Sequence, residues 1–440
     1  MHPVIRKDNM KICYATNFLP SYHKLWGGAE QVCYRLANIL TKNGHQLSIL
    51  ATKPLKKPEE DFDFFTIPVF ESYLPQRMRH SLRQLKLTIS PYDMISHISS
   101  HKTLKKINPD ILHLHNVSSL SFALAWSAQR LRIPTVYSVY DYAAICPMGH
   151  LWLLKDYADY EGTPCSKFHG PHCVDCLATY RKLGRLQKFL LSSFLRFRKR
   201  WFDFFLNKID GFVVLSPSNA KALEEYGIER ERIFIIPIPL SEEIDALPIE
   251  KNSILFVGVI QPRKGPHIVL EAMPQILTRI PDAKLYVIGE MIANKEYEEK
   301  MASLVGKSEL QGHIFLLGKR PYNEVRDFIQ KANVLVIPEQ WETIPPNTLT
   351  EGLVFGKAIV ASRIGGLLDF IVDGENGLLA DTRDSIDFSN KIISILEDQD
   401  LRQRLSRKAR ETGLELFSEE KVYQKLLDLY QSLSKAVVKH

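Results

Sequence analysis

Short apolar runs recur along the chain, separated by longer segments with the periodicity of an amphipathic helix. Most runs are apolar at every position rather than at alternate ones, which is typical of strands buried on both faces of a parallel sheet. Repeated strand–helix units of this kind predict a doubly wound α/β fold, and they fall into two sets. The expected strands are residues 11–16, 46–52, 110–115, 134–139 and 211–216 in the first set, and residues 253–258, 283–289, 313–318, 333–338 and 357–361 in the second.

The boundary between the two sets is expected near residues 238–252, where three prolines interrupt the pattern. This predicts an N-terminal domain of residues 1–240 and a C-terminal domain of residues 241–415. Residues 416–440 add a helix without a further strand, and this helix is expected to pack back on the N-terminal domain. Ligands of doubly wound sheets bind at the carboxyl edge of the strands, so we expect the chemistry in the loops that follow them.

Charge is distributed unevenly along the 440 residues. Residues 1–215 contain 29 basic and 16 acidic residues, a net charge of +13, whereas the remainder contains 28 basic and 34 acidic residues, a net charge of −6. The basic half favours an anionic partner, either nucleic acid or an anionic membrane surface. No apolar run reaches the roughly 18 residues of a membrane span. The first residues lack the apolar core of a signal peptide, so a cytoplasmic location is expected.

Two loops of the first half carry candidate binding residues. Gly27 and Gly28 follow the first strand and open a helix, so the free amides there are suited to an anion, although a simple turn would need the same residues. His113 and His115 stand at the end of the third expected strand. We expect them on opposite faces, one packed in the core and His115 facing the cleft.

In the second half, Arg263 and Lys264 lie between a strand end and the start of a helix. A cation at this edge would neutralise a diphosphate leaving group, as transfer from a nucleotide sugar requires. The alternative is that both are ordinary solvated side chains.

The stretch after the strand at 333–338 is the richest in polar candidates. Its loop contains Glu339 and Glu342, and a helix is expected to begin near Asn347. Backbone amides at that start could hold phosphate, and an acid within the helix could accept hydrogen bonds from ribose hydroxyls. The residues of this helix that we single out are Asn347, Thr348 and Glu351, and the pair Gly365 and Gly366 follows the next strand, where it would let the backbone approach a ligand.

These segments resemble the retaining glycosyltransferases of family 4, over residues 11–430 and most specifically over 253–380. The resemblance implies a GT-B fold, in which two Rossmann-like domains face each other across a cleft. It implies a retaining, metal-independent hexosyltransferase that needs no cofactor for catalysis. The implied donor is a UDP-, GDP- or ADP-sugar and the implied acceptor a glycan or lipid-linked sugar, as in polysaccharide biosynthesis at the inner face of a membrane.

The resemblance assigns roles to particular residues. Gly27 and Gly28 would line the cleft. Lys264 matches the lysine of the R-x4-K pattern and would hold the donor diphosphate, and Glu351 matches the second acid of the E-x7-E pattern and would hold the ribose. Arg263, Asn347, Thr348, Gly365 and Gly366 complete the expected donor-binding set, while Lys264, Glu342, Asp141 and His115 are the expected catalytic residues.

The chain departs from the family pattern at three positions. Val259 stands where the arginine of R-x4-K is expected, and Arg263 would have to substitute for it. Thr343 stands where the first acid of E-x7-E is expected, with Glu342 one residue early. Tyr140 replaces a histidine that contacts the donor sugar and precedes Asp141. These departures leave open a nucleotide-sugar-binding protein without catalysis, whereas no segment resembles a nucleic-acid-binding module.

Four of the six cysteines lie in a predicted insertion of residues 142–180. Thiolates grouped in this way predict a structural zinc site, with the alternative of reduced cysteines or a disulfide. The expected ligands are Cys146, Cys165, Cys173 and Cys176, with His150, His169 and His172 as substitutes.

A basic helix is expected over residues 181–208. Residues 179–208 contain nine basic residues and one acid, and Leu190, Phe194, Phe197, Trp201 and Phe205 recur at helical spacing. Such a helix could lie on an anionic bilayer, or its apolar stripe could pack on the N-terminal sheet while its charges are solvated.

Overall fold

The computed structural model describes most of the chain. The described residues are 9–20, 22–23, 27–56, 61–74, 92–155, 162–166, 168, 171–180, 184–241, 247–293 and 295–438.

The first half folds into a sheet of seven parallel strands in the order β3-β2-β1-β4-β5-β8-β9. The central strands are buried along nearly their whole length, as their uniformly apolar sequences predict. The strands are β1 (Lys11–Ala15), β2 (Gln46–Ala51), β3 (Asp63–Thr66), β4 (Ile111–Leu114), β5 (Thr135–Ser138), β8 (Gly211–Val214) and β9 (Ile233–Ile235).

The second half forms a parallel sheet of six strands in the order β12-β11-β10-β13-β14-β15. A separate two-stranded antiparallel ribbon, β6 (Trp152–Leu154) with β7 (Gly162–Pro164), belongs to the predicted insertion. The six strands are β10 (Ser253–Val257), β11 (Lys284–Ile288), β12 (Ile314–Gly318), β13 (Val334–Ile337), β14 (Ala358–Ser362) and β15 (Leu378–Ala380).

The predicted fold class of two doubly wound parallel sheets is confirmed, and all ten expected strands are present. The pattern missed the outer strands β3, β9 and β15. These are edge strands of three or four residues, and β3 is only half-buried, so they carry too few consecutive apolar positions to signal a strand.

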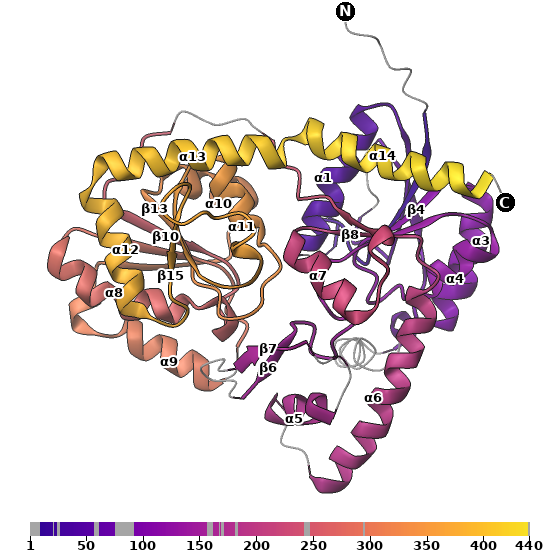
Figure 1. The fold of residues 1–440 in the computed structure, drawn as a ribbon, viewed down its shortest axis with the longest axis horizontal. Helices are drawn as coiled ribbons and strands as arrows, with labels where there is room; N and C mark the ends of the chain where they lie inside the picture. Colours follow the sequence, from indigo (N-terminus) through magenta and orange to yellow (C-terminus); the bar gives the residue numbers. More distant parts are fainter. Residues whose placement is uncertain are drawn as a thin grey trace, which may run out of the picture.

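Helices cover the sheets, and the two sheet domains lie side by side (Figure 1). The helices of the first half are α1 (Gly28–Lys42), α3 (Met94–Ile107), α4 (Ala123–Arg130), α5 (Pro171–Tyr180), α6 (Arg185–Leu206) and α7 (Pro217–Tyr226). Those of the second half are α8 (Pro266–Arg279), α9 (Lys295–Val305), α10 (Tyr322–Lys331), α11 (Asn347–Val354), α12 (Ser385–Glu397), α13 (Gln399–Phe417) and α14 (Glu419–Val438).

The last two helices run across both domains (Figure 1). α13 packs on α11 of the second domain, whereas α14 lies over the first sheet. The hydroxyl of Tyr423 is 2.9 Å from Nε2 of His45, and that of Tyr430 is 2.6 Å from Nδ1 of His113. These buried polar contacts join the end of the chain to the interior of the N-terminal domain. The chain therefore passes between the two domains a second time.

Candidate functional site

The two walls of the site are formed by loops at the carboxyl edges of the sheets, and the starts of two helices meet between them. A Cβ atom on Gly28, the first residue of α1, would lie 3.2 Å from Nδ2 of Asn347, the first residue of α11. Gly28 therefore permits a close approach of the two domains. Both helices direct their amino-terminal ends, which carry partial positive charge, toward this meeting point.

Glu351 of α11 is the best-anchored acid of the C-terminal wall. Its side chain is 5% exposed, and its Oε1 accepts a hydrogen bond from Nη2 of Arg35 on α1 at 3.1 Å. Tyr322 at the start of α10 also bonds to the carboxylate. Burial raises the pKa of Glu351, and the charge and hydrogen bond of Arg35 oppose that rise. An ion pair thus crosses from one domain to the other at the expected ribose-binding acid.

A second polar link between the domains lies at Asp369, whose carboxylate accepts hydrogen bonds from the amide and the hydroxyl of Ser218 at 3.0 and 2.9 Å. Ser218 belongs to the first turn of α7. Glu342 stands nearby, with its carboxyl group close enough to Asp369 and Lys221 to feel their charges. Burial, followed by repulsion from Asp369, raises the pKa of Glu342. Glu342 therefore faces the N-terminal domain.

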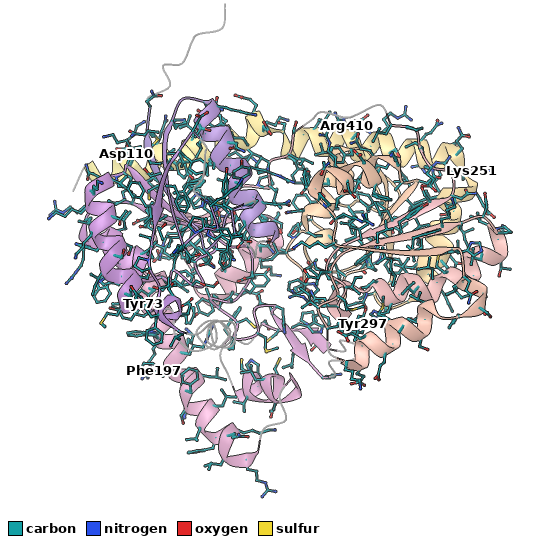
Figure 2. All side chains as sticks on the ribbon, turned by 180° about the vertical axis from the view of Figure 1, so that it is seen from behind. Tyr73, Asp110, Phe197, Lys251, Tyr297 and Arg410 are labelled. Carbon is teal, nitrogen blue, oxygen red and sulfur yellow. The ribbon has the colours of Figure 1, made fainter. Side chains whose placement is uncertain are left out.

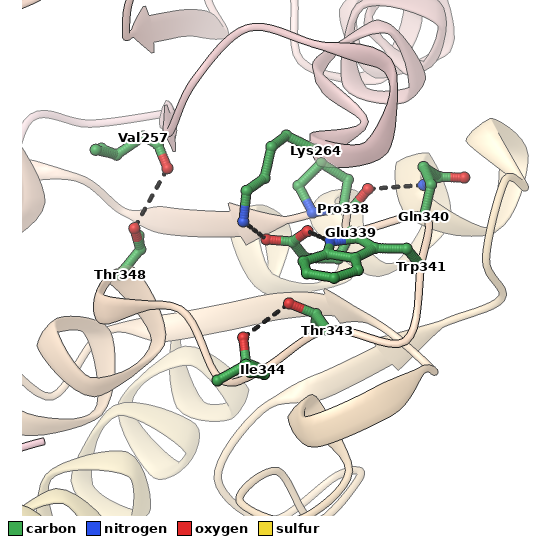
Figure 3. A network of polar contacts seen from close by, with 9 residues as sticks. All are labelled: Val257, Lys264, Pro338, Glu339, Gln340, Trp341, Thr343, Ile344 and Thr348. Atoms are coloured by element: carbon green, nitrogen blue, oxygen red, sulfur yellow. Dashed lines mark hydrogen bonds and ion pairs between the residues drawn. The ribbon is translucent and has the colours of Figure 1, made fainter. Parts of the chain in front are cut away.

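Lys264 ends a short 3-10 turn after β10, and its ammonium group contacts Oε1 of Glu339 (Figure 3). Oε2 of the same acid accepts a hydrogen bond from the indole of Trp341 at 2.6 Å. Arg263 lies over the Trp341 ring, with Cζ 5.0 Å from its centroid. The two basic side chains and the loop after β13 are thereby held together, although Lys264 is paired with an acid of its own domain.

The glycines after β14 are required by the loop that faces them. Gly365 has φ +55°, and a Cβ there would lie 2.5 Å from the amide nitrogen of Thr343. A Cβ on Gly366 would lie 2.7 Å from Cδ of Pro345. The amide of Gly366 donates to the carbonyl of Thr343 at 2.9 Å, so this amide is engaged within the protein. The pair serves the packing of two loops, and the amides at the start of α11 are the better phosphate donors.

Thr348 and Thr343 both use their hydroxyls inside the C-terminal wall (Figure 3). Thr348 donates to the carbonyl of Val257 at 3.3 Å, which ties the first turn of α11 to the end of β10. Thr343 is buried and donates to the carbonyl of Ile344 at 2.8 Å. At the position of the expected first acid, the chain therefore has a hydroxyl that is used locally.

The N-terminal wall contains a cavity of about 90 Å³ lined by His115, Asn116, Tyr140 and Asp141, among others. Nδ1 of His115 is 2.9 Å from the Tyr140 hydroxyl. Its Nε2 is buried with no hydrogen-bond partner among the described residues. Burial lowers the pKa of His115 to about 3, so the imidazole is neutral at physiological pH.

His113 within β4 and His115 directly after it do not lie on opposite faces, and that prediction was wrong. Their rings stack with centroids 4.2 Å apart, because positions two apart on a strand share a face. His113 is enclosed completely and contacts the hydroxyls of Tyr430 and Ser138 at 2.6 and 2.8 Å. His113 is thus a core residue, whereas His115 reaches the cavity.

Asp141 lines the same cavity, and it is exposed to solvent although much of its surroundings is protein. Its Oδ1 accepts a hydrogen bond from the amide of Ala143 at 2.8 Å. The surrounding protein raises the pKa of Asp141, and the Ala143 amide and the charge of Arg263 oppose that rise. Arg263 therefore acts on an acid of the opposite domain.

The sequence analysis did not single out three residues of the site. Arg35 and Tyr322 lie within ordinary amphipathic helices, and only the folded chain places them at Glu351. Glu30 accepts a hydrogen bond from the Gly27 amide at 2.8 Å and another from Asn116 at 2.7 Å. Its spacing of three residues from Gly27 is the signal of a helix cap and could have identified it.

The cysteine-bearing insertion packs against the C-terminal wall. Trp152 of β6 and Cys176 of α5 form a small apolar cluster with Trp341, whereas Cys173 packs in a different cluster beside Leu195 of α6. All six cysteines are thiols. Across the described part of the chain, no three His, Cys, Asp or Glu side chains gather in a group that could hold a metal ion, and His169 lies outside it. The expected zinc site has no ligand set there.

Helix α6 projects away from both sheets (Figure 1), and Phe197 lies on this projecting part (Figure 2). Its apolar stripe divides in two. The carboxyl-terminal end is buried, with Phe202 4% exposed and Phe205 fully enclosed. Four apolar side chains nearer the start are 58–71% exposed, namely Leu186, Phe189, Leu190 and Phe197. Of the helices described, none is both long enough and apolar enough to cross a bilayer.

Similar proteins fall into one family. Residues 26–243 match the model described as Glycosyltransferase Family 4, and residues 239–412 match Glycosyl transferases group 1. An uncharacterised glycosyltransferase of Methanocaldococcus jannaschii is 32% identical over 208 residues, which cover 47% of this chain and 55% of that protein. A D-inositol 3-phosphate glycosyltransferase of Corynebacterium urealyticum is 30% identical over 193 residues, which cover 42% and 44%. The chain spans about half the length of these relatives.

Solved structures share the whole fold. The Anabaena protein HepE, crystallised with UDP-glucose, superimposes with a TM-score of 0.65 at 15% identity, covering 96% of this chain and all of that one. Sucrose-phosphate synthase of Thermosynechococcus elongatus gives a TM-score of 0.68 at 18% identity, covering 97% of this chain and all of that one. With both family models matched in sequence order over two facing parallel sheets, the chain belongs to the family 4 glycosyltransferases and has their GT-B fold.

Proposed function

We propose that the protein transfers a hexose from a nucleotide-sugar donor to a glycan or lipid-linked acceptor, with retention at the anomeric carbon and without a metal ion. One observation carries this proposal: the start of α11 and Glu351 lie against α1 of the opposite domain, and Arg263, beside Lys264, is close enough to Asp141 to oppose the rise in its pKa. The side chains that meet there offer groups suited to different parts of a nucleotide sugar. The relative HepE, crystallised with UDP-glucose, supports a donor of this class.

The donor half of the reaction needs positive charge where the leaving diphosphate forms. The ammonium group of Lys264 would leave Glu339 and pair with the diphosphate instead. The backbone amides at the start of α11 would add hydrogen-bond donors that are already in place. Glu351, held ready by Arg35 and Tyr322, would accept hydrogen bonds from the ribose hydroxyls. These groups stabilise charge that develops in the transition state, which is how they would raise the rate.

The acceptor would enter the N-terminal wall. Asp141 can accept a hydrogen bond from a sugar hydroxyl, and the open Nε2 of neutral His115 can donate or accept one, depending on its tautomer. Glu342 reaches toward the same region from the opposite wall. Closure around both substrates would exclude the water that would otherwise hydrolyse the donor.

The positions at which the chain departs from the family pattern favour a second function. Thr343 uses its hydroxyl on the neighbouring carbonyl, and Tyr140 uses its own on His115. Neither residue brings the charge that the family pattern has there. A protein of this kind could bind a nucleotide sugar without turning it over.

The test is release of nucleoside diphosphate from UDP-, GDP- and ADP-sugars, with and without a lipid extract from the source organism. Lys264→Ala and Glu351→Ala should abolish a lipid-dependent release. Lys284→Ala is the matched control, because this lysine is paired with Glu250 on the surface of the same domain at 3.1 Å. If the protein binds a nucleotide but releases no nucleoside diphosphate from any donor, the proposal of a transferase gives way to that of a nucleotide-sugar-binding protein.

We propose further that α6 brings the enzyme to an anionic membrane, where a lipid-linked acceptor is embedded. Its exposed apolar residues share one helical face, and Arg185, Arg196 and Arg200 flank them in exposed positions. An interfacial helix needs an apolar face bordered by basic side chains, and this segment has both. The net charge of +13 in residues 1–215 favours the same partner.

Vesicle flotation tests this surface. The wild type should float with vesicles containing phosphatidylglycerol and not with neutral phosphatidylcholine vesicles, and the double variant Phe189→Ser/Phe197→Ser should lose most of that binding. Ile386→Ser, which removes a 63% exposed apolar side chain from α12, should float like the wild type. Equal flotation of the double variant would remove the membrane role of α6.

A further inference from the structure

Arg35 is a residue of the N-terminal domain whose charged end lies on the C-terminal wall. It projects from α1 and places Nη2 3.1 Å from Glu351, with Cζ 5.0 Å from the centroid of the Tyr322 ring. The exposed fraction of its side chain is 17%, and that of Glu351 is 5%. The guanidinium is thus held between an aromatic face and a carboxylate, in one orientation.

One face of this guanidinium has no partner. Nη1 of Arg35 is buried, and no hydrogen-bond acceptor reaches it among the residues that the structure describes. A buried donor without an acceptor is costly, and more so when it is charged. The unused N–H groups lie beside the acid that is expected to hold ribose and on the helix whose first residue meets Asn347. An oxygen of a bound ligand would satisfy them.

We propose that Arg35 is a donor-binding residue supplied by the N-terminal domain, with Nη1 donating to a ribose or phosphate oxygen of a nucleoside diphosphate while Nη2 keeps Glu351. This inference rests on the proposed function, because it assumes that the donor occupies the site at Glu351. It adds a contact from the opposite wall. Donor binding would then require both domains, which explains why an ion pair joins them at this place.

The chemistry of arginine suits this double task. Its planar guanidinium presents donors in two directions, so one side can orient a carboxylate while the other binds a ligand oxygen. Lysine offers a single ammonium centre and would have to choose between the two. Arg35 also balances the charge of Glu351, so that the acid remains an acceptor for hydroxyl groups next to an anionic ligand.

Calorimetric titration of the full chain tests the proposal. UDP, GDP and ADP are titrated first, and the tightest binder is compared with its phosphate-free nucleoside. Arg35→Gln should weaken the nucleoside diphosphate by about tenfold or more, since a charge-assisted hydrogen bond is lost, and Arg35→Lys should recover only part of it. A larger loss for the diphosphate than for the nucleoside would identify a phosphate oxygen as the partner, and equal losses a ribose oxygen.

The matched control is Lys42→Gln, which removes one positive charge from an exposed position of the same helix. Its affinity should stay within about twofold of the wild type. Thermal unfolding without ligand separates binding from folding: Arg35→Gln and Arg35→Lys should keep midpoints close to each other although their affinities differ.

Two results would overturn the inference. Unchanged binding by Arg35→Gln would show that Arg35 does not contact the nucleotide. Tighter binding would show that Arg35 competes with the donor for Glu351. Failure of the wild type to bind any of the three nucleotides is a different outcome, because it would remove the proposed function together with this inference.

Discussion

The two walls of the cleft are built from different chemistry. The C-terminal wall is charged and its charges are paired: Lys264 contacts Glu339 of the same domain, and Glu351 is held by Tyr322 and by Arg35 of the opposite domain. The N-terminal wall has an aromatic interior in which His113 and His115 are stacked and their protonation is suppressed by burial.

The difference suits the proposed function, in which the C-terminal wall would bind the donor and the N-terminal wall the acceptor. A diphosphate is the same in every nucleoside diphosphate sugar, so fixed charges and helix amides would serve it. Acceptors vary in shape and in the hydroxyl that reacts, so their wall consists of hydrogen-bonding groups in a cavity whose size and lining can change without loss of charge balance. Four predictions probe this contrast, beginning with the largest expected effect.

Among changes in the C-terminal wall, loss of the charge at Lys264 should lower activity most. Lys264→Ala should lower kcat/KM by roughly 100- to 1000-fold, as expected for a group that stabilises charge in the transition state. Arg263→Ala should cost less, because Arg263 lies over Trp341 rather than on an acid. Steady-state kinetics with the donor found by the release assay measure both, and an equal loss in the two variants would contradict the ranking.

Tyr430→Phe should destabilise the buried interior on which the N-terminal wall rests. Its hydroxyl contacts His113 at 2.6 Å and Tyr14 at 3.1 Å, and removing it leaves a buried imidazole nitrogen without a partner. The expected loss is about 1–3 kcal/mol in the free energy of unfolding, measured in urea. Tyr286→Phe, which removes a hydroxyl bonded to Glu250 near the surface, should cost less.

Asp141→Asn should show a stability gain that depends on pH. The surrounding protein raises the pKa of Asp141 above 3.8, so the folded state holds the proton more tightly than the unfolded state does. Wild-type stability therefore falls as pH rises from 3.8 through the raised pKa, and the asparagine variant lacks this decline. Unfolding of both proteins between about pH 4 and pH 8 should show a difference that grows with pH and then levels. A constant difference would mean that Asp141 titrates as an ordinary acid.

The smallest effect is expected at the second link between the walls. Ser218→Ala removes the hydroxyl bonded to Asp369 at 2.9 Å but keeps the amide bond at 3.0 Å. We expect a loss of about 0.5–1 kcal/mol in the free energy of unfolding. A loss above about 2 kcal/mol would show that this link, and not Arg35 with Glu351, controls how the domains meet.

Much of the fold could be predicted because its signals are local. A strand buried on both faces must be apolar at every position, so ten strands were recognisable from their own residues. Lys264 and Glu351 stand in short patterns near the ends of strands, and their roles stay predictions; the structure pairs them with Glu339 and Arg35. The edge strand β3, half-buried and four residues long, has no such pattern.

The sequence by itself determined the two parallel sheets and the family of the chain, because their signals depend on neighbouring residues. Tertiary structure alone decided which charges pair. Arg35 and Glu351 are separated by 316 positions, and Lys264 and Glu339 by 75, so nothing local connects them. It also decided that Cys173 and Cys176, three positions apart, pack in two different apolar clusters, since packing rather than spacing sets which side chains meet.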